Sequence, residues 1–224
     1  MKTIFKRIRP ALLMVALALA LAGQAWAQST IWTASSTMSA PRVGASNYID
    51  WWVVRAGPTK LISVFGYNGG PLQYLQFFDN PNGPVLNITA WDNVNNNFTN
   101  ANHALTTGQR VQLTNTVAGI TAGIYYARPY TTNAFYLYDT YAHAIATGSE
   151  TGLKTVSGGS STATMLLVPL HSMAMAASDN YSIMITGTGM GFGKGLTIAN
   201  STTPATYTTP GLSNFTATVT YTAP

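Results

Sequence analysis

Residues 61–79, LISVFGYNGGPLQYLQFFD, place a turn-forming segment between two apolar segments. The turn, Tyr67–Pro71, contains Asn, Gly and Pro, which favour a reversal of the chain. The apolar segments on either side are predicted to be the two strands of a hairpin, with Leu61, Ser63 and Phe65 on one face of the first strand. An isolated apolar hairpin is not stable in water, so this one needs a second layer. We expect the C-terminal third of the chain to supply that layer.

The rest of the chain continues in the same style, with short strand candidates separated by turn residues. Phe215–Tyr221 alternates most regularly, with apolar and aromatic side chains on one face and threonines on the other. This pattern is typical of a half-buried antiparallel strand. After the leader described below, no segment has helical periodicity over ten or more residues. We therefore predict an all-β protein, an antiparallel β-sandwich of jelly-roll-like type that carries a small inserted β module.

Two changes of composition indicate the insertion. Residues 92–102, DNVNNNFTNAN, are rich in asparagine, and residues 157–161, SGGSS, are small and flexible. The segment between them has its own short strand candidates and turns. The predicted division is an inserted module of residues 92–161, a host sandwich of residues 41–91 and 162–224, and an N-terminal arm of residues 28–40.

Residues 1–27 have the pattern of a cleaved export signal. Basic residues precede an apolar run, residues 11–22, and the segment ends in Ala25-Trp26-Ala27, a small-x-small cleavage pattern. The apolar run is shorter than the about 20 residues that a membrane span requires. We expect cleavage after Ala27, no membrane span in the mature chain, and a secreted protein that is extracellular or on the cell surface.

The low charge of the mature chain limits its partners. Four of the eleven basic residues lie in the leader, so seven basic residues oppose six acids after cleavage, and the net charge falls from +5 to about +1. No basic cluster remains, and we expect no nucleic-acid binding through phosphate neutralisation. Few surface charges fit a protein covered by neighbouring subunits, because charge is depleted in interface cores. The chain has no cysteine, so its stability comes from its apolar cores.

One motif in the predicted module resembles a known family. The pattern H-x-L-x-T-G-x-x-V-x-L-T at residues 103–114, followed by GIYY at 123–126 and NAFYL at 133–137, is similar to a small β module of bacteriophage tail and virion structural proteins. Ala104 and Ala134 stand where that family has Gly and Thr. The flanking segments GYN, YLQFFD and FGKGLTIANS resemble a phage-type β-sandwich. The resemblance implies a structural, surface-exposed role without catalysis.

Residues typical of catalytic or metal sites are scattered. His103, His143 and His171 lack the spacing of metal ligands. The acids are isolated and stand mostly beside turn residues, where Asp commonly caps turns, and they form no evident pair across a cleft. The glycine-rich residues 187–195 lack the Gly and Ser/Thr positions of a phosphate-binding loop. We expect no catalytic residue, no metal and no cofactor, so a secreted hydrolase is the least favoured alternative.

These observations favour a secreted, non-enzymatic structural subunit that assembles with copies of itself into a surface filament, sheath or layer. The N-terminal arm would either add a strand to a neighbouring subunit or be disordered. Its assembly candidates are Ile31, Trp32 and Met38. The alternative is an adhesin or carbohydrate-binding protein that uses exposed aromatic rings of the module to bind surface glycans. The possible ligand-facing aromatics are Tyr125, Tyr126, Tyr130, Tyr136, Tyr138 and Tyr141.

Overall fold

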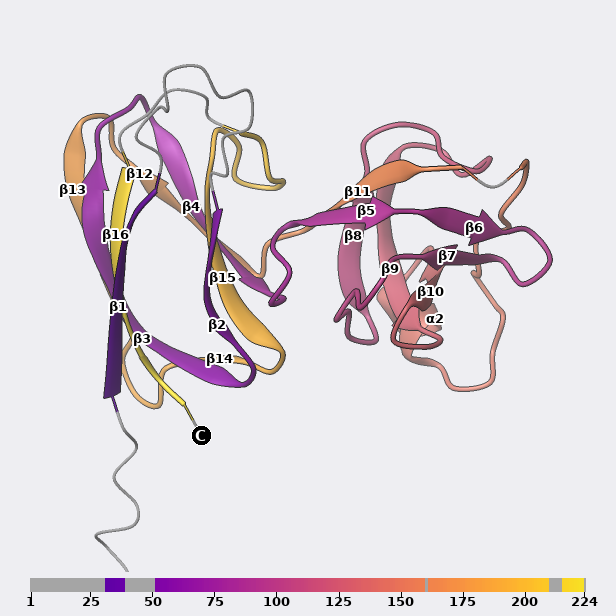
Figure 1. Cartoon of the computed structure of the whole chain (residues 1–224), viewed down its shortest axis with the longest axis horizontal. Helices are drawn as coiled ribbons and strands as arrows, with labels where there is room; N and C mark the ends of the chain where they lie inside the picture. The colour runs from indigo at the N-terminus through magenta and orange to yellow at the C-terminus, as the bar shows by residue number, and fades with distance from the viewer. Residues whose placement is uncertain (1–30, 39–50, 160, 210–214, 224) are drawn as a thin grey trace, which may run out of the picture.

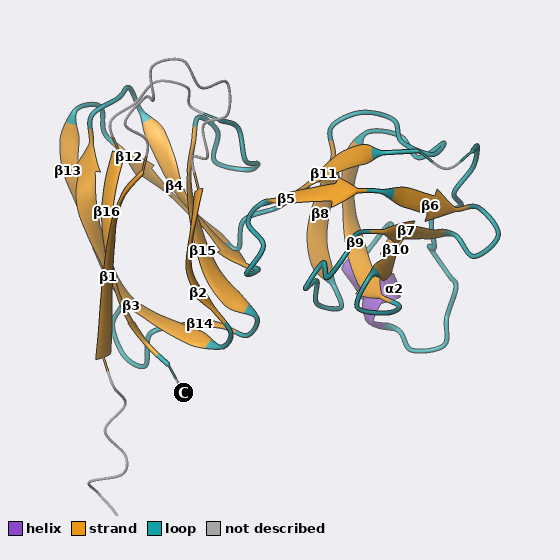
Figure 2. Cartoon of the chain, in the orientation of Figure 1, coloured by secondary structure: helices purple, strands orange, loops and turns teal. Residues whose placement is uncertain are grey.

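The computed structural model describes residues 31–38, 51–159, 161–209 and 215–223, the first of these ranges by its backbone alone. The predicted leader, residues 1–27, and its cleavage site lie outside them. The described part is a two-sheet sandwich joined to a strongly curled third sheet (Figure 1), and nearly every regular element is a strand (Figure 2). This confirms the predicted all-β sandwich class. In these ranges no helix is long and apolar enough to cross a bilayer.

The sandwich is built from two antiparallel sheets. Sheet A, in the order β1-β16-β3-β13 with β14 also paired to β3, contains β1 (Ile31–Met38), β16 (Phe215–Thr222), β3 (Thr59–Asn68), β13 (Asp179–Met184) and β14 (Met190–Phe192). Sheet B, in the order β12-β4-β15-β2, contains β12 (His171–Met175), β4 (Gln73–Asp79), β15 (Gly195–Ser201) and β2 (Trp51–Ala56). Inward-facing apolar side chains of both sheets form one core, which includes Leu61, Val64, Leu75, Phe77, Leu196, Ile198, Phe215 and Val219.

The predicted hairpin at residues 61–79 is wrong, because its two strands lie in opposite sheets. β3 pairs with β16, β13 and β14, whereas β4 pairs with β12 and β15. The buried side chain of Asn68 holds the crossing between the layers. Its Nδ2 donates to the carbonyls of Pro71 and Ala176, both at 2.8 Å, and its Oδ1 accepts from the N–H of Gly70 at 3.1 Å. The turn residues therefore form an arch between sheets.

A β-bulge changes the predicted faces of β3. Opposite β16, Ser63 pairs with Thr220 and Leu61 with Tyr221, which leaves Ile62 as the extra residue. A bulge of this kind reverses the alternation beyond it. Leu61 and Val64 are consequently both completely buried, whereas Phe65 is 50% exposed. The expectation that Leu61 and Phe65 share a face is therefore wrong.

Sheet C forms the module. Its order is β5-β11-β8-β9-β10-β7-β6, with β5 (Val85–Ile88), β11 (Ala163–Leu167), β8 (Gln109–Leu113), β9 (Gly123–Pro129), β10 (Ala134–Tyr138), β7 (Asn97–Thr99) and β6 (Ala90–Asp92). The first and last strands of this order are separated in the chain by Thr89 alone, so the sheet curls back on itself. The short helix α2 (Tyr141–Ile145) follows β10.

The strand pairing puts the module borders outside the predicted residues 92 and 161. The apolar sequences of β5, β6 and β11 favour the host sandwich, but the pairing of these strands shows that they complete sheet C. The insertion therefore lies between β4 and β12, both strands of sheet B. Its ends are adjacent, because the N–H of Leu167 donates to the carbonyl of Pro84 at 2.8 Å.

Side chains join the module to the sandwich. The Nδ2 of Asn80 donates to the carbonyl of His103 at 2.9 Å, and the Nδ2 of Asn82 donates to the carbonyl of Asn102 at 2.5 Å. Phe78, on the outer face of sheet B, is 1% exposed and belongs to the same apolar cluster as the module core. The two regions are thus fastened together by polar and apolar contacts.

Candidate functional site

The first candidate site is the edge of sheet A formed by β1 and β16. The two strands run antiparallel over their whole length, from Ile31 opposite Thr222 to Met38 opposite Phe215. Among the described strands, β1 pairs with β16 and with no other. Neither strand contains a charged residue. Charge and proline are the usual means by which proteins prevent an edge from pairing with another chain, and this edge has neither.

β16 is anchored to the sandwich independently of β1. On its other side it pairs with β3, and Phe215, Ala217 and Val219 are buried in the core. Tyr181 of β13 reaches across β3, and its hydroxyl donates to the carbonyl of Thr216 at 2.6 Å. A Cβ on Gly66 would clash with both groups, so this crossing requires glycine there. Burial raises the pKa of Tyr181, which keeps the hydroxyl protonated as a donor.

The sequence-predicted assembly residues all lie on β1. Ile31, Trp32 and Met38 stand opposite Thr222, Tyr221 and Phe215 in the backbone register. The structure thus places β1, residues 31–38 of the predicted arm, on the edge of its own sheet A. The environment of the three side chains lies outside what the structure describes.

The second candidate site, the tyrosine set of the module, separates into buried and accessible residues. Tyr125 is 8% exposed and its hydroxyl donates to the carbonyl of Thr121 at 2.9 Å. Tyr138 is 2% exposed and lies under the guanidinium of Arg128, whose Cζ is 4.2 Å from the ring centroid. These two tyrosines are structural, so the expectation that they face a ligand is wrong.

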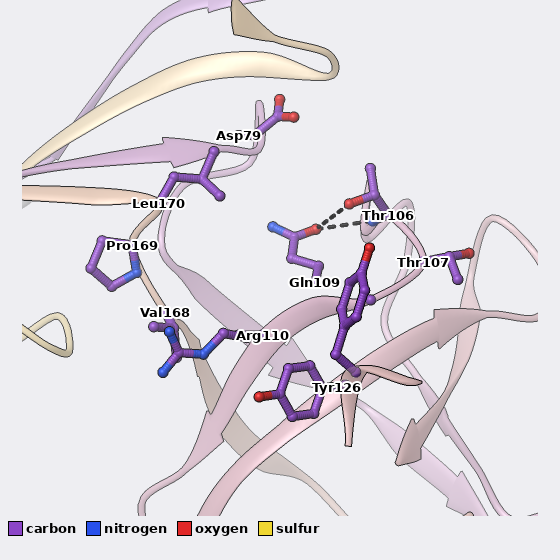
Figure 3. A pocket seen from close by; sticks show the side chains of 11 residues that line it. Asp79, Thr106, Thr107, Gln109, Arg110, Tyr126, Val168, Pro169 and Leu170 are labelled. Carbon is purple, nitrogen blue, oxygen red and sulfur yellow. Dashed lines mark hydrogen bonds between the residues drawn. The ribbon is translucent and has the colours of Figure 1, made fainter. Parts of the chain in front are cut away.

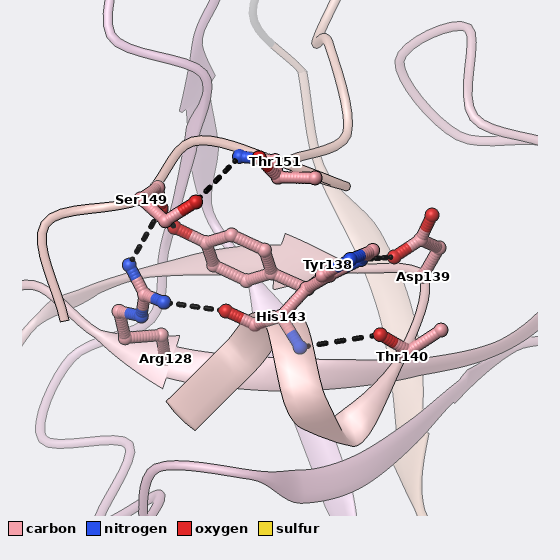
Figure 4. A network of polar contacts seen from close by, with 7 residues as sticks. All are labelled: Arg128, Tyr138, Asp139, Thr140, His143, Ser149 and Thr151. Atoms are coloured by element: carbon pink, nitrogen blue, oxygen red, sulfur yellow. Dashed lines mark hydrogen bonds and ion pairs between the residues drawn. The ribbon is translucent and has the colours of Figure 1, made fainter. Parts of the chain in front are cut away.

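Arg128 explains why Tyr138 is covered (Figure 4). Its guanidinium donates to the carbonyls of His143, Ala144, Ala146 and Ser149, which fastens α2 and the following loop over the outer face of sheet C. The guanidinium of Arg128 therefore has a structural role, because these hydrogen bonds fix the backbone of α2 and of the loop that follows it. Tyr138 lies on the outer face of β10, because Phe135 and Leu137 of the same strand are in the core. It is nevertheless buried, because Arg128 and the loop after α2 lie over it.

The four remaining tyrosines form two pairs. Tyr130, 60% exposed, is tilted against Tyr136 with 5.2 Å between ring centroids. Tyr126 and the exposed Tyr141 meet edge to face at 6.2 Å. The second pair lines a cleft of the described part of the chain, and the first pair does not.

That cleft, of about 490 Å³, lies where sheet C meets the sandwich (Figure 3). Its lining comes from Asp79 at the end of β4, residues 106–110 at the start of β8, Tyr126, Tyr141, and residues 168–170 between β11 and β12. Sequence reasoning named the two tyrosines but missed Gln109 and Arg110. The polar alternation of β8 indicates an outward face, but the position of Arg110 directly opposite Tyr126 depends on the β8–β9 register.

The histidines have separate roles. His103 is buried, with Nδ1 accepting from the N–H of Leu105 at 3.0 Å and Nε2 facing the carbonyl of Thr131 at 2.9 Å, so the proton is on Nε2. His143 contacts Asp139 at 2.6 Å, and this hydrogen bond lowers the pKa of Asp139. Within the described ranges, no three His, Cys, Asp or Glu residues are grouped to hold a metal ion.

Comparison of the chain with protein-family models, with curated proteins and with solved structures finds no match.

Proposed function

We propose that this protein is a secreted, non-enzymatic structural subunit that joins copies of itself into a filament, sheath or layer, with β1 of one subunit pairing on β16 of the next. The observation that supports this is the uncharged edge on which one terminal strand lies along the full length of another. β16 keeps its core contacts and its pairing with β3 whichever copy of β1 occupies its free side.

Exchange between subunits costs little because it replaces one β1–β16 pairing by an identical one. Residues 39–50 connect β1 to β2 in the sequence, and a chain of that length can span at most about 40 Å. A reciprocal exchange closes into a dimer, whereas a head-to-tail exchange continues as an open polymer. The head-to-tail form is the one proposed here.

Deleting residues 28–40 tests the role of β1. We expect the truncated protein to lose polymer formation, as seen by negative-stain microscopy and sedimentation. A synthetic peptide of residues 28–40 should bind the truncated protein and keep it monomeric by occupying the β16 edge. If the truncated protein forms the same assemblies at the same concentration, β1 is not the connector.

Cysteine crosslinking tests the exchange itself. Because the chain has no native cysteine, any disulfide must come from the introduced residues. Ser35 and Thr218 are directly opposite, at a spacing of strands that suits a disulfide. Assemblies grown from a mixture of Ser35→Cys and Thr218→Cys subunits should give disulfide-linked dimers on oxidation. A mixture of Ser35→Cys with Ser172→Cys, on sheet B, should not. A third variant carries both Ser35→Cys and Thr218→Cys in one chain. If only this variant forms the disulfide, and only within its own chain, β1 is not exchanged between subunits.

A further inference from the structure

We propose that the cleft between sheet C and the sandwich binds an acidic glycan, a sugar chain that carries carboxylate groups. This goes beyond assembly and does not depend on it. The cleft combines an aromatic wall, hydrogen-bond donors that are not used by the fold, and one cation without a partner, and these three features together suit a carboxylated sugar.

The aromatic wall consists of Tyr126 and Tyr141. Tyr126 is on β9, and Tyr141 begins α2, which Arg128 holds in place. Gly108 supports the second ring from behind, since a Cβ there would lie 2.5 Å from the Tyr141 ring. The glycine of the T-G motif therefore sets the position of an exposed tyrosine. Ring faces of this kind pack against the apolar faces of sugars while their hydroxyls hydrogen-bond.

Gln109 supplies a fixed polar group inside the cleft. Its Oε1 accepts from the backbone N–H of Thr106 at 2.9 Å, which fixes the orientation of the amide. The amide nitrogen consequently points away from Thr106 toward the open middle of the cleft (Figure 3). A donor held in this way loses little rotamer entropy when a sugar hydroxyl or carboxylate binds.

Arg110 supplies the cation that could pair with an anionic ligand in the cleft. Arg110 is exposed and makes no side-chain hydrogen bond or ion pair within the described part of the chain. Asp79 lines the same cleft, but its carboxylate already accepts from the N–H groups of Gly193, Lys194 and Gly195, at 2.6–3.1 Å. The guanidinium thus remains available for a ligand carboxylate, to which arginine binds through paired hydrogen bonds.

An extended peptide is a poorer occupant. Peptides that bind sheets commonly add a strand to a free edge. β8, which forms the floor of the cleft, is already paired on one side with β11 and on the other with β9. The cleft therefore offers side chains and no free backbone edge, as a sugar-binding site does.

Binding of an oligogalacturonate to the intact mature protein, measured by calorimetry with maltohexaose as the neutral probe, tests the proposal. We expect Tyr126→Ala to weaken oligogalacturonate binding about tenfold or more. Arg110→Gln should weaken it by a similar factor and remove the preference over maltohexaose. Tyr130→Ala, in the tyrosine pair away from the cleft, is the matched control and should bind as the parent does.

Circular dichroism and melting of each variant show whether it is folded, and Arg110→Gln alters an exposed side chain, so it keeps the test valid if Tyr126→Ala does not fold. The proposal is overturned if the parent binds neither probe, if it binds maltohexaose as tightly as oligogalacturonate, or if Tyr130→Ala weakens binding as much as Tyr126→Ala. Loss of polymer formation on deletion of residues 28–40 should leave this binding unchanged.

Discussion

The sandwich and the module differ in how the backbone groups of their outermost strands are paired. In the module, the two outer strands of sheet C are consecutive in the chain, and the buried His103 and the partly buried Arg128 secure the loops. In the sandwich, sheet A ends at an uncharged edge that is occupied by a terminal strand. The outer strands of the module sheet are joined within the chain, whereas the sandwich has the edge at which we propose that another copy pairs. A single β chain thus combines a sheet whose outer strands are joined with a sheet whose edge strand is uncharged.

The largest effect should come from separating the two regions. Replacing residues 85–166 by a short Gly-Ser turn joins Pro84 to Leu167, which are already hydrogen-bonded, so little loop-closure entropy is lost. We expect the sandwich to keep one cooperative transition, with its calorimetric unfolding enthalpy lower by about 60 kcal/mol. Phe78→Thr should be included because the deletion uncovers this side chain. Loss of the transition would mean that the two regions share one indivisible core.

A smaller effect should come from opening the module. His103→Ala leaves the buried N–H of Leu105 and the carbonyl of Thr131 without their partners and creates a cavity against Phe135. We expect a loss of about 3 kcal/mol or more in the free energy of unfolding, measured by denaturant titration.

His171→Ala is the matched control for that measurement. His171 is exposed on β12 of the sandwich, so its replacement should change the free energy of unfolding by less than about 0.5 kcal/mol. Equal losses in the two variants would remove the distinction between a histidine that secures the module and one that does not.

The smallest effect should be a loss of stability at low pH that comes from two carboxylates of the module. Hydrogen bonds from His143 to Asp139, and from the Asn95 side chain to Asp92, lower both carboxyl pKa values below the usual 3.8. A lowered folded-state pKa stabilises the protein above the unfolded pKa, and this contribution is lost as the pH falls through the folded value. Both groups are exposed, so the change is modest.

The Asp139→Asn variant measures this contribution. We expect its melting temperature to be slightly below that of the parent at pH 7 and to approach it as the pH falls through the lowered pKa of the parent carboxyl, which is then protonated too. A difference that stays constant from pH 7 to pH 2 would show that the hydrogen bond between His143 and the Asp139 carboxylate does not cause it.

The fold class followed from the sequence because strand length, alternation and turn residues are local properties. The hairpin prediction failed because Asn68 closes an arch through Ala176, which is far away in the chain. The prediction that Phe65 shares a face with Leu61 failed for a similar reason, because the bulge at Ile62 arises from the pairing of β3 with β16. The module borders were missed because Val85–Ile88 is as apolar as a host strand, and only its pairing with β11 shows where it belongs.

The sites divide in the same way. Clustering of tyrosines in the sequence indicated which part of the module is rich in aromatic rings. Alternation could not show that Arg128 and the loop after α2 cover Tyr138, since the cover comes from another segment. The cleft is formed by segments as distant as Asp79 and Leu170, so no local pattern indicates it. The low charge of the terminal strands, in contrast, is visible directly in the sequence.

The antiparallel, full-length pairing of β1 on β16 has a mechanical consequence for a polymer joined by exchange. Tension along the polymer would pull the two strands past each other, so the backbone hydrogen bonds of all the paired residues bear the load together instead of breaking one at a time. The module joins the chain of the sandwich at the ends of β4 and β12, which belong to sheet B and not to sheet A, where β1 would be exchanged. A subunit could then be stretched without disturbing the cleft that it carries.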